Sequence, residues 1–274
     1  MLFKKIINSI IINGITLFVS LVFILPLLVV LLNSFKNKAE SNTMTLRLPA
    51  KWIIENYQIV IERGKLFLSF FNSMLYASVG SIIIVLIISA AAFVLARNRS
   101  KLNNFIYYFM ILGIALPINN VTLMKIMKIT DLINTQRGII LIYISINLPI
   151  SLFIVYGFIR NLPVEIDEAA IIDGCSPRQL LLKIGYPLLS PVMVTVFVLN
   201  FMAIWNDFTM PLYFLNNSSK WPMTLAVYNF FGIFENQWNL VCADIMLTML
   251  PVLIIFILAQ KYIVGGVSAG AVKG

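Results

Sequence analysis

Histidine is absent from the 274 residues, and charged residues make up only 11% of them. Without imidazole the chain lacks the commonest metal ligand and the side chain that most readily exchanges protons near neutral pH. Two cysteines, Cys175 and Cys242, are too few for a disulfide framework. No G-x-x-x-x-G-K-[ST] phosphate-binding loop occurs. These absences disfavour metal-dependent, acid–base and ATP-hydrolysing enzymes, and no catalytic residue, metal ligand or bound cofactor is expected in this chain.

Apolar residues are abundant instead, at 60% of the chain, with a mean hydropathy of +0.95. Soluble domains contain about 45–50% apolar and about 25% charged residues, so this composition indicates an integral membrane protein. The net charge of +9 is consistent with basic residues at the membrane edges. No basic patch interleaved with aromatic residues occurs, so nucleic acid is not an expected partner, whereas membrane lipid is.

The apolar runs predict an all-α fold with six transmembrane helices, all within one domain over residues 1–274. The helices are expected at about residues 10–32, 70–96, 104–124, 138–159, 187–205 and 240–259. The first run is longer than a signal-peptide core of about 7–15 residues, so we expect it to be retained. Pro117 is expected to bend the third helix. Lysine and arginine divide evenly between the two sides, so the positive-inside rule leaves the orientation open.

The loop over residues 160–186 is the most informative segment, because it reads as a helix–turn–helix hairpin rather than as a spacer. Pro163 suits the first position of a helix that we expect to run to Asp173, and Gly174 suits a left-handed C-terminal cap. Ser176-Pro-Arg-Gln179 matches a capping box that begins a second helix. Two interpretations remain equally supported by the residues: a helix that docks in a groove of another protein, or an interfacial hairpin that only connects two spans.

At this point the sequence resembles a known family. Glu168-Ala169-Ala170, Gly174, Ile184 and Pro187 resemble the EAA loop of ABC-importer permeases, and the extended pattern from Pro163 is similar to the carbohydrate-uptake (MalG-like) branch. Tyr186 departs from that pattern, which usually has leucine there. Further segments look like the same branch in order and spacing: Asn56-Tyr57, Phe71-Asn72-Ser73, Trp205-Asn206-Asp207-Phe208 and Gly270-Ala-Val-Lys-Gly274.

The resemblance implies a permease subunit of an ATP-driven, binding-protein-dependent importer, for a sugar or oligosaccharide. It implies that the 160–186 loop and both termini are cytoplasmic, in a bacterial inner membrane. The implied partners are a second homologous permease subunit, two ATP-binding subunits that hold ATP and Mg, and an extracytoplasmic solute-binding protein. It assigns ATPase coupling to Glu168, Ala169, Ala170, Asp173, Gly174, Ile184 and Pro187, and a contact of the tail with the ATPase to Gly270 and Lys273.

A secondary transporter driven by an ion gradient is the alternative. Such proteins often have internal repeats and broken helices around charges at the membrane midplane, and the sequence shows neither. Within the spans, Asn147 and Asn200 are candidates either for hydrogen bonds between helices or for lining the pore. Asp207 and Asp244 are expected near the outer ends of their spans, where water or loop hydrogen bonds satisfy them. An aromatic belt at the outer face is expected from three tryptophans: Trp205, Trp221 and Trp238.

Overall fold

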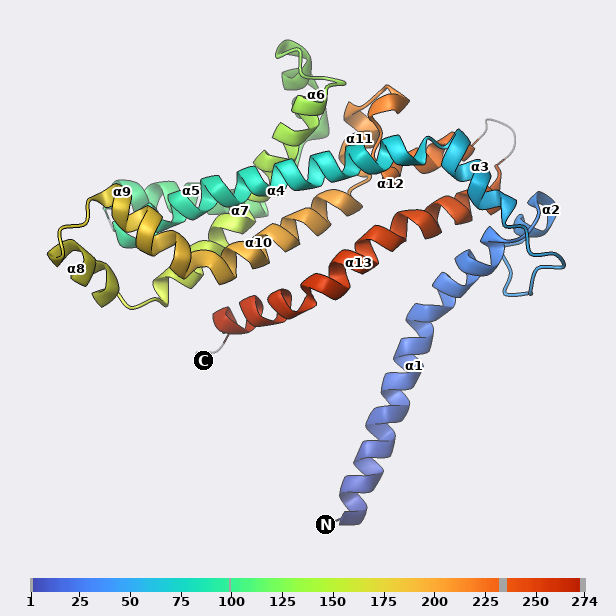
Figure 1. The fold of residues 1–274 in the computed structure, drawn as a ribbon, viewed down its shortest axis with the longest axis horizontal. Coiled ribbons are helices and arrows are strands. Elements are labelled where there is room, and N and C mark those ends of the chain that lie inside the picture. The colour runs from blue at the N-terminus through green and yellow to red at the C-terminus, as the bar shows by residue number, and fades with distance from the viewer. Residues whose placement is uncertain (1, 99, 232–235, 272–274) are drawn as a thin grey trace. The chain divides into compact units, whose positions relative to one another are not determined.

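The computed structural model describes residues 2–98, 100–231 and 236–271, with side chains for the described residues between 11 and 260. Helices dominate this part of the chain (Figure 1), where the β-pairing is limited to an isolated bridge between Phe231 and Asn236. The predicted all-α fold is therefore confirmed. The chain divides into two compact units. Their segments are Met1–Phe67 with Ala226–Pro251, and Leu68–Leu225 with Val252–Gly274.

The first unit contains the N-terminal helices and the beginning of the last one. Its described helices are α1 (Leu2–Ser34), α2 (Lys38–Ser41), α3 (Glu55–Arg63), the 3-10 turn η3 (Val227–Phe230) and the start of α13 (Trp238–Ala271). A small apolar core forms where α3, η3 and α13 meet. Its buried members are Val60, Phe230, Leu240, Val241 and Ala243.

A buried lysine organises the polar side of the same unit, a feature that the sequence did not predict. Lys36 is 1% exposed, and its Nζ donates to the Asn33 Oδ1 (3.0 Å) and to the Thr45 carbonyl (2.7 Å). Asn56 donates to the Lys36 carbonyl (2.9 Å) and accepts a hydrogen bond from Asn239 (2.9 Å). Because a buried ammonium is costly unless its protons are satisfied, these bonds explain how Lys36 is tolerated there.

The second unit contains most of the long helices, and Figure 1 shows α8 and α9 at one of its ends. It begins within α4 (Leu66–Arg97) and continues through α5 (Lys101–Ala115), α6 (Asn120–Ile129) and α7 (Gln136–Arg160). The loop that follows contains α8 (Glu165–Ile172), α9 (Pro177–Gln179) and the π-helical segment η1 (Leu180–Gly185). The remaining helices are α10 (Tyr186–Asn206), α11 (Thr209–Phe214), η2 (Ser218–Lys220) and α12 (Met223–Ala226).

Five helices in the described chain are long and apolar enough to cross a membrane. They are Ile11–Ser34, Leu66–Arg97, Gln136–Arg160, Pro177–Asn206 and Trp238–Gln260, and the bent pair α5 and α6 would make a sixth. The bend expected at Pro117 is present, but it is a break rather than a curve, because α5 and α6 are separate helices at an angle of 116°. A residue before proline is pushed out of the helical region, and Leu116 is accordingly extended, with φ −81° and ψ 125°.

The expected second helix of the hairpin also differs from the prediction. It does not end before the fifth span, because α9, η1 and α10 run on as one helix over Pro177–Asn206. The π-helical segment ends two residues before Pro187, which cannot donate the hydrogen bond of a regular helix. The hairpin therefore consists of one free helix, α8, and the extended end of a long helix.

Candidate functional site

The turn of the 160–186 loop has the local geometry that its residues predicted. Gly174 has a φ of +80°, the left-handed conformation that glycine adopts readily. The Ser176 hydroxyl accepts from the Gln179 amide, and the Gln179 side chain accepts from the Ser176 amide at 2.9 Å, so the capping box is present. The helix before the turn is shorter than expected, at Glu165–Ile172 rather than Pro163 to Asp173.

The candidate coupling residues differ in their exposure. Ala170 is buried (5% exposed) and Ile184 is half-buried, whereas the rest of the set is exposed: Glu168, Ala169, Asp173, Gly174 and Pro187. Two apolar side chains at the end of α8 are also open, since Ile171 is 59% and Ile172 is 85% exposed. An exposed apolar pair of this kind fits either contact with another protein or contact with the membrane surface.

Arg97, the last residue of α4, holds the beginning of α8. Its Nε lies 2.5 Å from the Asp167 Oδ2 in an ion pair whose side chains are 16% and 7% exposed. The other two nitrogens of the same guanidinium donate to the carbonyls of Leu162 (3.3 Å) and Pro163 (3.4 Å). Sequence reasoning missed this contact, because residues on separate helices carried no local signal that they meet.

Two further contacts join α4 to the segment that follows the turn. Gly185 lies so close to Phe93 that a Cβ at this glycine would stand 3.1 Å from the phenyl ring. The Tyr186 hydroxyl donates to the Leu86 carbonyl at 3.4 Å. Tyr186, the residue that departs from the family pattern, thus makes a polar contact that leucine could not make.

At its other end, α4 is bound to the loop over residues 215–225. Asn72 Nδ2 donates to the carbonyls of Ser219 (2.9 Å) and Trp221 (3.1 Å). The Ser73 hydroxyl accepts from the Met223 amide at 2.9 Å, and the Tyr76 hydroxyl donates to the Lys220 carbonyl at 2.8 Å. Neutral side chains of α4 therefore satisfy four backbone groups of this loop, those of Ser219, Lys220, Trp221 and Met223.

Asp207 links α10 to the elements that follow it. Its carboxylate accepts hydrogen bonds from the Tyr143 hydroxyl on α7 (3.0 Å) and from the backbone amides of Thr209 (3.2 Å) and Met210 (3.0 Å). Its carbonyl accepts from the Thr224 hydroxyl at 2.9 Å. These bonds confirm the expectation that loop hydrogen bonds satisfy this acid.

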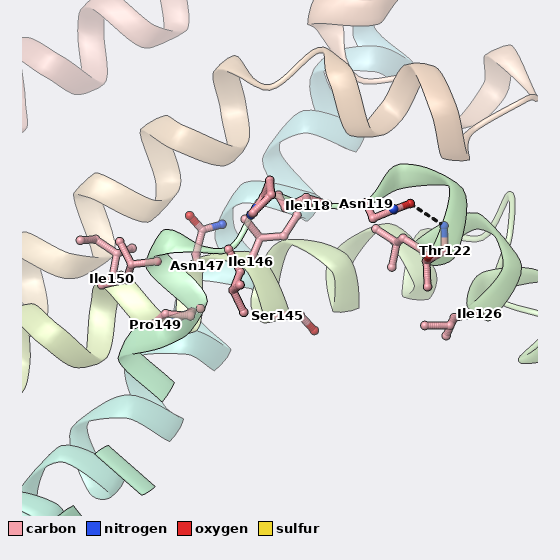
Figure 2. A pocket seen from close by; sticks show the side chains of 14 residues that line it. Ile118, Asn119, Thr122, Ile126, Ser145, Ile146, Asn147, Pro149 and Ile150 are labelled. Atoms are coloured by element: carbon pink, nitrogen blue, oxygen red, sulfur yellow. Dashed lines mark hydrogen bonds between the residues drawn. The ribbon is translucent and has the colours of Figure 1, made fainter. Parts of the chain in front are cut away.

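A cavity of about 630 Å³ lies between α5, α6 and α7 (Figure 2). Its walls are mainly apolar, and Asn119, Thr122, Ser145 and Asn147 supply polar groups. Asn147, one of the two candidates for the pore, lines this cavity and donates to the Tyr143 carbonyl of its own helix (2.8 Å).

Asn200, the second candidate, lies in a different setting. It is 4% exposed, and its amide donates to the Ser151 hydroxyl at 2.9 Å, which joins α10 to α7. Of the two roles expected for Asn200, the structure therefore shows the hydrogen bond between helices. Pore lining by either asparagine stays a prediction.

Other expectations for polar and aromatic residues need correction. Trp205 does not belong to a belt at the membrane surface, since it is 1% exposed and stacks on Phe201 with ring centres 5.6 Å apart. Asp244 is also 1% exposed, so water at the end of its span does not satisfy it. Of the tail residues, Lys273 lies outside the described residues, and Gly270 lies in the last turn of α13.

Comparisons with known proteins place this geometry in a family. Residues 89–268 match the model of the binding-protein-dependent transport system inner membrane component. The chain is 33% identical to a probable starch degradation products transport system permease protein, AmyC, of Thermoanaerobacterium thermosulfurigenes, with 93% of each chain covered. It is 32% identical to the melibiose/raffinose/stachyose import permease protein MelC of Bacillus subtilis, with 91% of each covered.

A solved structure shares the fold. The match is to a chain of a bacterial ABC transporter involved in the import of the acidic polysaccharide alginate, with a TM-score of 0.79. It covers 92% of this chain and 95% of that one at 19% sequence identity. The 160–186 loop lies within the residues that match the family model.

Proposed function

This chain belongs to the family of binding-protein-dependent transport system inner membrane components, and from that membership we propose that it is a permease subunit of an ATP-driven importer for a sugar or oligosaccharide. The carbohydrate class is supported by the names of its relatives, which include starch degradation products and melibiose, raffinose and stachyose. The observation that carries the proposal is the exposed face of α8, a short helix held on the end of a spanning helix.

The face of α8 that includes Glu168 and Ala169 docks on a separate ATP-binding subunit. Asp173 and Gly174 end this helix and set the turn, while Ile184 and Pro187 lead back into the span. The buried Ala170 leaves α8 thin on the side that packs inward. If α8 binds the open and closed forms of the ATPase pair differently, ATP binding biases the permease between inward- and outward-facing states.

The complete importer contains a second homologous permease subunit, two ATP-binding subunits and an extracytoplasmic solute-binding protein. ATP and Mg bind to the ATP-binding subunits, in accordance with the lack of a phosphate-binding loop in this sequence. The 160–186 loop and both termini lie in the cytoplasm, and the tail with Gly270 and Lys273 reaches the ATPase pair.

The translocation path forms between the two permease subunits. The cavity lined by Asn147 is the part of this chain that contributes to it, because amide and hydroxyl groups there offer hydrogen bonds to a polyhydroxylated solute. Asn200 contributes from α10 by fixing that helix to α7 next to the path.

The test is reconstitution of the complete complex in liposomes, with uptake and ATP hydrolysis measured together. Wild-type uptake should require ATP and the binding protein. Glu168→Lys and Gly174→Pro should reduce uptake while ATP hydrolysis continues, because they alter the docking face and its turn. The matched control is Glu62→Lys, an equal charge reversal at an exposed residue of α3, which should transport normally. Uptake that survives ATP depletion and stops when an ion gradient collapses would refute the proposal and favour a secondary transporter.

A further inference from the structure

We infer that Arg97 is a positioning residue that makes α4 move together with α8, so that a displacement of α8 reaches the far end of α4. This inference rests on the proposed function, because a docked ATPase subunit supplies the displacement. It concerns Arg97, which lies outside the 160–186 loop, and the transmission of a displacement along α4.

Arg97 contacts the beginning of α8 through one ion pair and two hydrogen bonds of the same guanidinium. All three guanidinium nitrogens of Arg97 are used, one on the Asp167 carboxylate and two on successive carbonyls at the approach to α8. A planar guanidinium fixes direction as well as distance, which a lysine ammonium does not. Asp167 is 5% exposed, in contrast to its neighbour Glu168, so the paired acid faces inward while the docking acid faces outward.

α8 is short, and within the loop it packs against η1, on the other side of the turn. It contains eight residues, and helices of fewer than about 12 residues are marginal by themselves in water. Its links to α7 and α9 are short non-helical stretches, one of which contains Gly174 in the left-handed conformation. Hence Arg97 supplies a charged attachment of α8 to α4, in addition to the packing of α8 against η1.

α4 is suited to carry a displacement along its length. Of the five described helices long enough to span a membrane, α4 alone has no internal proline, whereas the others contain Pro26, Pro149, Pro191 and Pro251. Internal proline kinks a helix, so α4 is the one without such a hinge. From Ser73 to Arg97 it extends about 36 Å, at 1.5 Å per residue.

The far end of α4 holds the 215–225 loop by Asn72, Ser73 and Tyr76. A shift of α4 along its axis would therefore change the hydrogen bonds that define this loop. The Arg97–Asp167 pair and the Asn72 contacts thus lie at the two ends of one continuous helix. This connects the docking helix to a loop at the opposite end of the second unit.

The experiment measures solute imported per ATP hydrolysed in the reconstituted complete complex. Arg97→Gln and Asp167→Asn should each lower this ratio about tenfold, a typical size for coupling between sites, and the double variant should lower it no further. Asp167→Glu should restore most of it, because the charge remains. The matched control is Arg160→Gln, at the end of α7, which should keep the wild-type ratio.

A distance measurement separates positioning from general structural damage. In a Cys242→Ser background, spin labels at Cys175 and at an Asn98→Cys substitution report on the turn that follows α8 and on the end of α4. Their separation should stay constant between the nucleotide-free and ATP-trapped complex, and should change when Arg97→Gln is added. If Arg97→Gln prevents assembly, Arg97→Lys is measured instead. The lysine keeps the positive charge but cannot donate to the carboxylate and both carbonyls in the planar geometry of a guanidinium.

The outcomes are distinct. This inference would be overturned if the wild-type complex couples ATP to uptake and the Arg97→Gln variant shows the same ratio and the same label distance. The proposed function would then remain intact. A wild-type complex without ATP-dependent uptake would overturn the proposed function itself.

Discussion

The two ends of α4 are held in chemically different ways. At Arg97 the helix contacts its neighbour through a charged pair that is largely removed from solvent, whereas at Asn72 and Ser73 it contacts a loop through neutral hydrogen bonds. Each neutral bond contributes about 1 kcal/mol net, while breaking a buried ion pair costs about 3–5 kcal/mol. The comparison suggests that the first attachment persists through a working cycle and that the second is easily exchanged.

The largest effect is expected from removing the charge at the first end. Arg97→Gln leaves Asp167 without its partner and weakens α8 by about 3 kcal/mol, so amides in its first turn should exchange with deuterium on the order of a hundredfold faster. Hydrogen exchange of the complex, read over residues 165–168, checks this. Arg160→Gln should leave these amides at the wild-type rate. Wild-type protection in the Arg97 variant would remove the proposed difference between the two ends.

An intermediate effect is expected at the other end. Asn72→Ala removes two side-chain hydrogen bonds to the loop and should weaken it by about 2 kcal/mol, or roughly thirtyfold in the exchange of amides over residues 218–223. The first turn of α8 should be unaffected. The matched control is Asn206→Ala, because that exposed asparagine bonds only within its own helix in the described contacts. An effect of Asn72→Ala larger than that of Arg97→Gln would reverse the comparison.

The smallest effect is expected from Ser73→Ala, which deletes the acceptor of one buried amide. The Met223 amide loses its partner at a cost of about 1 kcal/mol, so its exchange should accelerate about fivefold. Ser73→Thr keeps the hydroxyl and should preserve most of the protection. Equal exchange at Met223 in the alanine variant and in the wild type would show that this bond contributes nothing to the loop.

Features set by neighbouring residues could be predicted from the sequence. The left-handed Gly174 and the capping box of Ser176 and Gln179 depend on a few consecutive residues, and both are present. The apolar runs likewise indicated an all-α membrane fold, because about 20 apolar residues have few alternatives to a spanning helix. The family followed from the order of short motifs around those runs.

Contacts between distant segments could not be predicted in this way. Arg97 looked like a basic residue at the end of a span, and Asp167 like one acid among several, until the fold placed them together. Lys36 and Asp244 are buried for the same reason, since hydropathy does not say which polar residues a tertiary contact will cover. The sharp break after Leu116 was underestimated because Pro117 signals a disturbance of the helix but not its angle.

The central claim is that a separate ATP-binding subunit grips α8. A photoactivatable cross-linker attached at an Ile172→Cys substitution, in a Cys175→Ser and Cys242→Ser background, tests it directly, because position 172 is the most exposed apolar site of this helix. In the assembled complex the account predicts a cross-link to the ATP-binding subunit that Glu168→Lys weakens. Labelling of that position from outside intact cells by a membrane-impermeant maleimide would contradict the account.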